Sequence, residues 1–137
     1  MTAITAVAGQ RLTAAFLNAN CIPGPWVPIA PSNGYANVSG QIIFQARLLN
    51  SVTAEVEGTL IKPSGGTDGD IIGNMPTGMI PTSTQGKNGN WTQGSTIHGA
   101  NLNITVRNTG AIVLFSSALP STSYTQFCFS FAVTLDG

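Results

Sequence analysis

The last stretch of the chain, residues 126–136, alternates between large apolar side chains and small or polar ones. Successive side chains of a β-strand point to opposite faces, so this pattern predicts a strand with one apolar wall. Because this wall holds half of the six Phe residues, we expect the strand to lie in the middle of a sheet. The wall consists of Phe127, Phe129, Phe131, Val133 and Leu135.

Other segments repeat this period of two. Residues 52–60 alternate apolar with polar side chains, and the preceding Asn50-Ser51 is typical of a tight hairpin turn that follows a strand over 41–49. A strand over 101–107 is predicted to turn Leu102, Ile104 and Val106 inward. Further short or buried strands are expected at 26–29, 35–38, 70–74 and 111–115, with loops at 62–69 and 85–94.

Strands of this kind, separated by turn signals, predict an all-β fold, an antiparallel β-sandwich of jelly-roll-like form. With 137 residues, the chain has enough length for one compact domain and too little for two.

The N-terminal region has a different period. Leu12, Ala15, Phe16 and Ala19 follow helical spacing, which predicts a short helix over about 11–20 after an extended stretch at 1–9. Such a helix is too short to be stable alone, so we expect it to pack on a partner. The predicted organisation is an attachment segment at 1–22 and a β-sandwich domain at 23–137.

Composition narrows the possible partners. Charged residues are only 7% of the chain and the net charge is zero, whereas nucleic-acid binding needs clustered Lys and Arg. We therefore expect no nucleic-acid partner. No apolar run reaches the roughly 20 residues of a membrane span, so no membrane partner is expected either. Cys21 and Cys128 are expected to be free thiols, with pairing between them left as an alternative.

Residues that could support catalysis or metal binding are few. His98 is the only histidine, and neither a triad nor a metal site can be assembled around it from spacing. Asp68 and Asp70 flank a glycine, but the further oxygen ligands of a calcium loop are missing. Glu55 and Glu57 share one strand face without an opposing acidic cluster, so they are interpreted as outward positions of the strand. We therefore expect no enzyme activity, no metal and no cofactor.

Aromatic residues are better candidates for binding. Trp91 and Tyr124 could stack on the apolar faces of sugar rings, and they could equally cap the sandwich or lie at a subunit contact. Trp26 is expected in the core. Small polar residues on the outer faces of the strands at 101–107 and 126–136 could lie at a threefold interface, which would account for the scarcity of charge.

Three stretches of the sequence also carry a family resemblance. These are Ala8 to Asn18 (AGQRLTAAFLN), Val56 to Leu60 (VEGTL) and Ile72 to Pro81 (IGNMPTGMIP). Together they resemble the C-terminal head domains of tail fibres and minor tail proteins of tailed phages, especially phages of actinobacteria. In the third stretch Met75 replaces a Leu of the family pattern, and Met79-Ile80 replace Tyr-Arg. The resemblance implies a β-sandwich head, usually trimeric, on the outside of a virion.

Two functions fit these observations. The short segment before the sandwich favours a capsid decoration protein, a homotrimer made in the bacterial cytoplasm and docked on the major capsid protein through Leu12, Phe16 and Leu17. The alternative is a tail-located adhesin that recognises host cell-surface glycan through Trp91 and Tyr124. A third possibility, an isolated carbohydrate-binding module, would call for a secretion signal, which the N-terminus does not resemble.

Overall fold

The computed structural model describes residues 22–61, 69–93, 96–97, 102–115 and 125–136. Within these ranges every regular element is a β-strand, which confirms the predicted all-β class. The predicted helix at 11–20, and with it Leu12, Phe16 and Leu17, lies outside the described residues. The division of the chain at residues 22 and 23 therefore stays a prediction.

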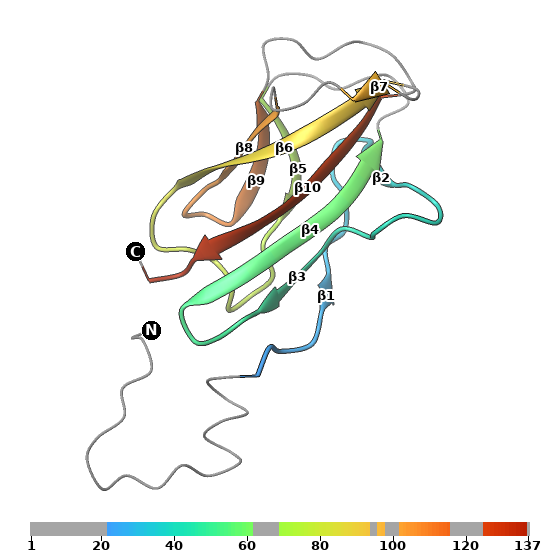
Figure 1. Ribbon diagram of the computed structural model, residues 1–137. Coiled ribbons are helices and arrows are strands. Elements are labelled where there is room, and N and C mark those ends of the chain that lie inside the picture. The colour runs from blue at the N-terminus through green and yellow to red at the C-terminus, as the bar shows by residue number, and fades with distance from the viewer. Residues whose placement is uncertain (1–21, 62–68, 94–95, 98–101, 116–124, 137) are drawn as a thin grey trace, which may run out of the picture.

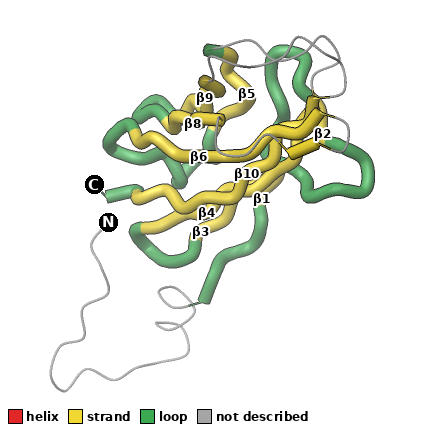
Figure 2. The backbone as a smooth tube through the Cα atoms, turned by 45° about the horizontal axis from the view of Figure 1, so that its top comes forward, coloured by secondary structure: helices red, strands yellow, loops and turns green. Residues whose placement is uncertain are grey.

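The strands of the described residues form one antiparallel sheet that curls into two layers (Figures 1 and 2). The order across the sheet is β1-β3-β4-β10-β6-β8-β9-β5, while β2 pairs with β4 and β7 with β6. In chain order the strands are β1 (Val27–Pro28), β2 (Ala36–Asn37), β3 (Gln45–Leu48), β4 (Thr53–Ile61), β5 (Asp70–Asn74), β6 (Gln85–Gln93), β7 (Thr96–Ile97), β8 (Leu102–Val106), β9 (Ala111–Phe115) and β10 (Thr125–Thr134).

Strand β6 connects the two layers. Its first half pairs with β8, and its second half pairs with β10. Strand β10 lies between β4 and β6, so the C-terminal strand occupies the middle of the sheet, as its apolar wall predicted. Strand β10 pairs with β4 over most of its length, from Gln126 opposite Ile61 to Thr134 opposite Thr53. This pair forms the centre of the layer that contains β1, β3, β4 and β10.

The segment between β1 and β2 covers the outer edge of β5. The Ser32 amide donates to the Ile72 carbonyl oxygen at 2.9 Å, and the Tyr35 hydroxyl donates to Asp70 Oδ2 at 2.8 Å. The Ile29 amide in turn donates to the Phe44 carbonyl oxygen at 2.9 Å. The two ends of the curled sheet are therefore bridged by this segment, which leaves little of the β5 edge open.

The core fills the space between the layers. The apolar wall of β10 faces inward as predicted, with Phe131 only partly buried at its margin. The ring of Phe129 meets that of Phe44 edge-on, with the ring centroids 5.3 Å apart. All three predicted inward residues of β8 are fully buried. The largest fully buried side chains are those of Phe44, Phe127, Leu60, Ile72, Leu102, Ile104, Ile112 and Leu114.

Two predicted elements differ from the structure. The strand expected at 41–49 is only β3, and Ile42 and Ile43 are exposed before it. The reason is that β2 already pairs with the end of β4, so the chain must pass around that edge before β3 can join it. The loop expected at 85–94 is wrong for residues 85–93, which form β6. The first half of this strand pairs with β8 and its second half with β10.

Candidate functional site

The outer face of the β3–β4–β10 layer carries polar side chains of all three strands. Along β4 and β10, buried side chains alternate with less buried ones. The less buried side chains lie on this outer face. The strand register then sets them in cross-strand rows, in which opposite side chains are close enough to interact. One row holds Arg47, Glu55 and Ala132, the next Gln45, Glu57 and Ser130, and a third Thr59, Cys128 and Asn90.

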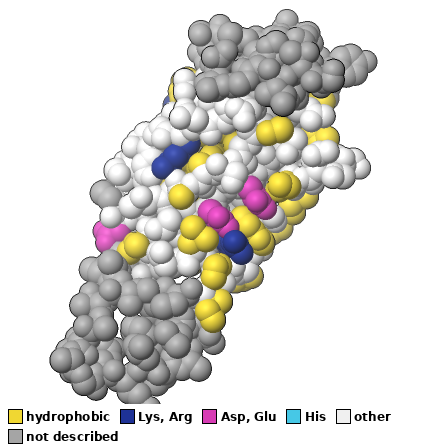
Figure 3. Space-filling view, in the orientation of Figure 1, with side chains coloured by type: hydrophobic (Ala, Val, Ile, Leu, Met, Phe, Trp, Pro, Cys, Tyr) yellow, Lys and Arg dark blue, Asp and Glu magenta, His cyan; other side chains and the backbone are white. Residues whose placement is uncertain are grey.

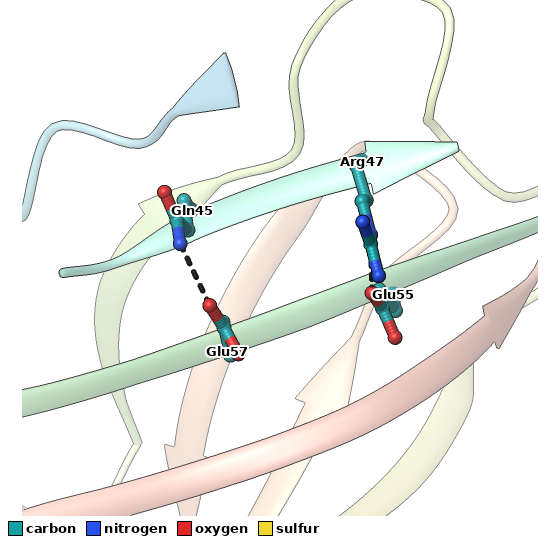
Figure 4. Close-up of polar contacts among 4 residues, drawn as sticks. All are labelled: Gln45, Arg47, Glu55 and Glu57. Carbon is teal, nitrogen blue, oxygen red and sulfur yellow. Dashed lines mark hydrogen bonds and ion pairs between the residues drawn. The ribbon is translucent and has the colours of Figure 1, made fainter. Parts of the chain in front are cut away.

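The two acidic side chains of this face are bonded to β3. The guanidinium of Arg47 forms an ion pair and hydrogen bond with Glu55, and Gln45 Nε2 donates to Glu57 Oε1 at 2.7 Å (Figure 4). Both glutamates lie between buried positions of β4, at outward positions of the strand as predicted.

Trp26 lies beside this network. The guanidinium carbon of Arg47 is 4.4 Å from the centroid of the Trp26 ring, a cation–π contact. Trp26 is only partly buried, so its expected place in the core is wrong. It precedes β1 at the margin of the sheet, where one face of the indole is covered by the arginine.

A groove opens where β6 leaves β10. The pairing between these strands ends at Asn90 opposite Cys128, and the first half of β6 then joins β8 in the other layer. The groove has a volume of about 480 Å³. Thr59 of β4 and Cys128 and Ser130 of β10 lie along it, between Ile42 on one side and Asn88 and Asn90 of β6 on the other. Figure 3 shows this face of the molecule, on which charged side chains are few.

Gly89 allows the strands to separate at this point. A Cβ atom there would lie 3.0 Å from the Cys128 carbonyl oxygen and 3.0 Å from Leu102 Cδ2. Only a residue without a side chain lets β6 lie against β10 and then turn to β8 without displacing either neighbour. The groove therefore forms because the backbone of β6 turns away from β10 at Gly89.

The predicted site residues fall in different places. Trp91 belongs to β6, where its backbone pairs with that of Phe127 in β10. Tyr124, His98 and Asp68 lie outside the described residues. Asp70 begins β5 and accepts the hydrogen bond from Tyr35. The structure thus tests neither of the two proposed sugar contacts. Asp70 has a structural contact, the hydrogen bond from Tyr35 that joins the segment before β2 to β5.

Sequence reasoning missed the groove residues Thr59, Asn88, Asn90 and Ser130. The one local signal was the Asn88-Gly89-Asn90 sequence, which indicated a turn by composition. In the structure it is a strand segment whose two amide side chains are exposed.

The described residues contain neither a cluster of metal-ligating side chains nor a membrane-spanning helix. Among them, His, Cys, Asp and Glu side chains nowhere gather in a group of three or more that could hold a metal ion. No helix of this part of the chain is long and apolar enough to cross a bilayer.

Comparison with known proteins gives likenesses in structure alone. No protein-family profile matches the sequence, and no curated protein matches it significantly. Among solved structures, the head domain of lactococcal phage bIL170, described as a receptor-binding domain, superposes with a TM-score of 0.62 at 17% identity, over 81% of this chain and 97% of that one. The receptor-binding protein of Listeria phage PSA superposes with a TM-score of 0.56 at 20% identity, over 88% of this chain and 70% of that one. The chain therefore has the fold of phage receptor-binding head domains, which confirms at the level of fold the resemblance found in its sequence.

Proposed function

We propose that this chain is the receptor-binding head of a tailed phage and that it recognises a glycan on the surface of the host bacterium. The observation that carries this proposal is the near-complete overlap with the bIL170 head domain, of which 97% is covered. The PSA receptor-binding protein gives independent support from a second phage.

This proposal reverses the order of the two functions considered from sequence. On the sequence alone, capsid decoration ranks first. The fold likeness supports receptor binding better, because both compared proteins are described as receptor-binding. We accordingly place the protein on the outside of the virion and assign it to the tail in preference to the capsid.

The proposed head is a non-enzymatic homotrimer. Support for a binding role comes from the two compared proteins, both of which are described as receptor-binding. Support for self-association comes from the exposed side chains of Ile43 and Ile80 together with a chain that is only 7% charged. Each protomer would be joined to its tail partner through residues 1–22.

Trp91 and Tyr124 remain our candidates for aromatic contacts with the glycan. Trp91 belongs to β6, and Tyr124 is the residue before β10 in the sequence. Their replacement by alanine is expected to weaken glycan binding, since an aromatic ring covers the apolar face of a sugar.

The test is to apply the purified, fluorescently labelled chain to a microarray of bacterial surface polysaccharides and to intact bacteria. Binding to a restricted subset of glycans, and to bacteria that display them, is expected. Light scattering of the same sample should give a mass close to three times 14.1 kDa. Binding to no glycan and no cell would contradict the proposal, with heat-unfolded protein as the control for non-specific adhesion.

A further inference from the structure

We infer that the groove where β6 leaves β10 is the glycan site, and that it takes an uncharged sugar unit rather than a phosphate-bearing one. This inference rests on the proposed function and gives it a location and a ligand class. The groove volume of about 480 Å³ lies within the range of roughly 300–1,000 Å³ that is usual for small-molecule sites.

The gap between β6 and β10, along which the groove lies, is bounded at both ends by hydrogen-bonded contacts. At one end the backbones of Asn90 and Cys128 are paired. At the other, the side chain of Gln85 bonds both backbone groups of Thr134, which places those groups on the β6 side of β10. Backbone groups point to the same side at every second residue of a strand, so the amides and carbonyls of Ser130 and Ala132 also face the gap. Of these two residues Ser130 lines the groove, so a ligand there would meet its backbone donor and acceptor as well as side chains.

The side chains of the groove suit the hydroxyl groups of a sugar. Asn88 and Asn90 are exposed, and each amide offers two donor hydrogens and one acceptor oxygen. The exposed hydroxyl of Ser130 can donate and accept. Sugar hydroxyls also donate and accept hydrogen bonds. Two adjacent hydroxyls of one ring could therefore form hydrogen bonds with a side-chain amide of β6 and with the Ser130 hydroxyl of β10. Ile42, 54% exposed, offers apolar surface for the C–H groups of the ring.

Charge argues against a phosphate-bearing ligand. None of the residues that line the groove is charged, whereas phosphate recognition in proteins relies on Arg or Lys. Glu57 lies in the same cross-strand row as Ser130, and an acidic neighbour disfavours an anion. The adjacent cation along β6 is Lys87, which does not line the groove.

The experiment compares variants of the full chain on an array that carries both uncharged polysaccharides and phosphate-bearing teichoic acids. Asn88→Ala and Asn90→Ala remove groove amides from exposed positions, and Asn74→Ala removes an exposed amide from β5 in the other layer. Each groove variant should bind about three- to tenfold more weakly, as expected for the loss of one or two hydrogen bonds. Asn74→Ala and Lys87→Gln should bind like the parent, and thermal melts should confirm that every variant is folded.

A second readout uses the thiol of Cys128, which lines the groove. In a Cys21→Ser background, saturation with the bound glycan should slow the reaction of Cys128 with a thiol reagent such as DTNB. Unchanged reactivity would place the glycan elsewhere.

The outcomes separate the two proposals. If the parent binds glycans and both groove variants bind equally well, the groove is not the site and the receptor-binding function stands. If binding is confined to teichoic acids and falls with Lys87→Gln, the uncharged ligand class is wrong. If the parent binds no glycan, the proposed function fails and the groove proposal fails with it.

Discussion

Gln85 holds the far end of β10 through its side chain rather than through its backbone. Its Oε1 atom accepts a hydrogen bond from the Thr134 amide at 3.0 Å, and its Nε2 donates to the Thr134 carbonyl oxygen. The amide side chain thus reproduces the pair of hydrogen bonds that a neighbouring strand would make. It allows β6 to leave β10 for the other layer without leaving this part of β10 unsupported.

Removal of this contact should destabilise the protein moderately. We expect Gln85→Ala to lower the free energy of unfolding by about 1 kcal/mol, because both hydrogen bonds are near the surface and water can replace them in part. The melting temperature should fall by about 4 °C. Gln85→Glu should not restore stability, since a carboxylate cannot donate to the Thr134 carbonyl. Chemical denaturation measures the change, with the exposed Gln41→Ala as a control that should remain within about 0.5 kcal/mol of the parent. Parent-like stability of Gln85→Ala would show that the contact contributes nothing.

Gly73 and Gly86 offer a matched pair of glycine substitutions in strands. A Cβ atom at Gly73 would lie 2.5 Å from Phe44 Cε2 and 2.9 Å from Ile29 Cγ2, whereas one at Gly86 would meet nothing within 4 Å. Gly73→Ala should therefore cost about 2 kcal/mol or more through overpacking of the core. Gly86→Ala should be neutral or slightly stabilising, since alanine restricts the unfolded chain. Equal melting temperatures for the two variants would refute the close packing around Gly73, which lies at the register shift of β5.

The contact between Tyr35 and Asp70 should couple the segment before β2 to the edge of β5. Tyr35 is 5% exposed, and its hydroxyl donates to a carboxylate oxygen. We expect Tyr35→Phe to cost about 1–2 kcal/mol, as is usual for a hydrogen bond to a charged partner. A double-mutant cycle with Asp70→Asn, measured by denaturant unfolding, should give a coupling energy of about 1 kcal/mol. Strictly additive effects would mean that the two side chains act independently.

Where apolar and polar residues alternate strictly, the sequence was sufficient to predict the strand. The wall that includes Phe127 and Val133 and the inward side of β8 are buried as predicted, because only one register puts every large apolar side chain in the core. Strand β6 could not be predicted in this way. Its first six residues, QGKNGN, contain no apolar side chain, and their strand conformation depends on two neighbours that are distant in sequence.

The groove was hidden from sequence for the same reason. Thr59, Asn90 and Cys128 form one row only through the register of three strands, and no local spacing connects them. Trp26 was expected in the core, whereas the guanidinium of Arg47 provides a partner for it at the margin of the sheet. Features that depend on pairing between distant segments therefore could not be predicted from local sequence patterns.

The final prediction concerns the N-terminal segment and the place of the protein on the virion. Under the proposed function, a chain that lacks residues 1–20 should fold but fail to enter particles, because the attachment would be lost. Replacement of Leu12, Phe16 and Leu17 by Ser should have the same effect, whereas Thr13→Ala should enter normally. Quantitative mass spectrometry of purified virions measures both incorporation and copy number. A tail location predicts far fewer copies of this chain than of the major capsid protein. A ratio near one would favour decoration of the capsid instead, and normal incorporation of the truncated chain would refute the N-terminal attachment under either function.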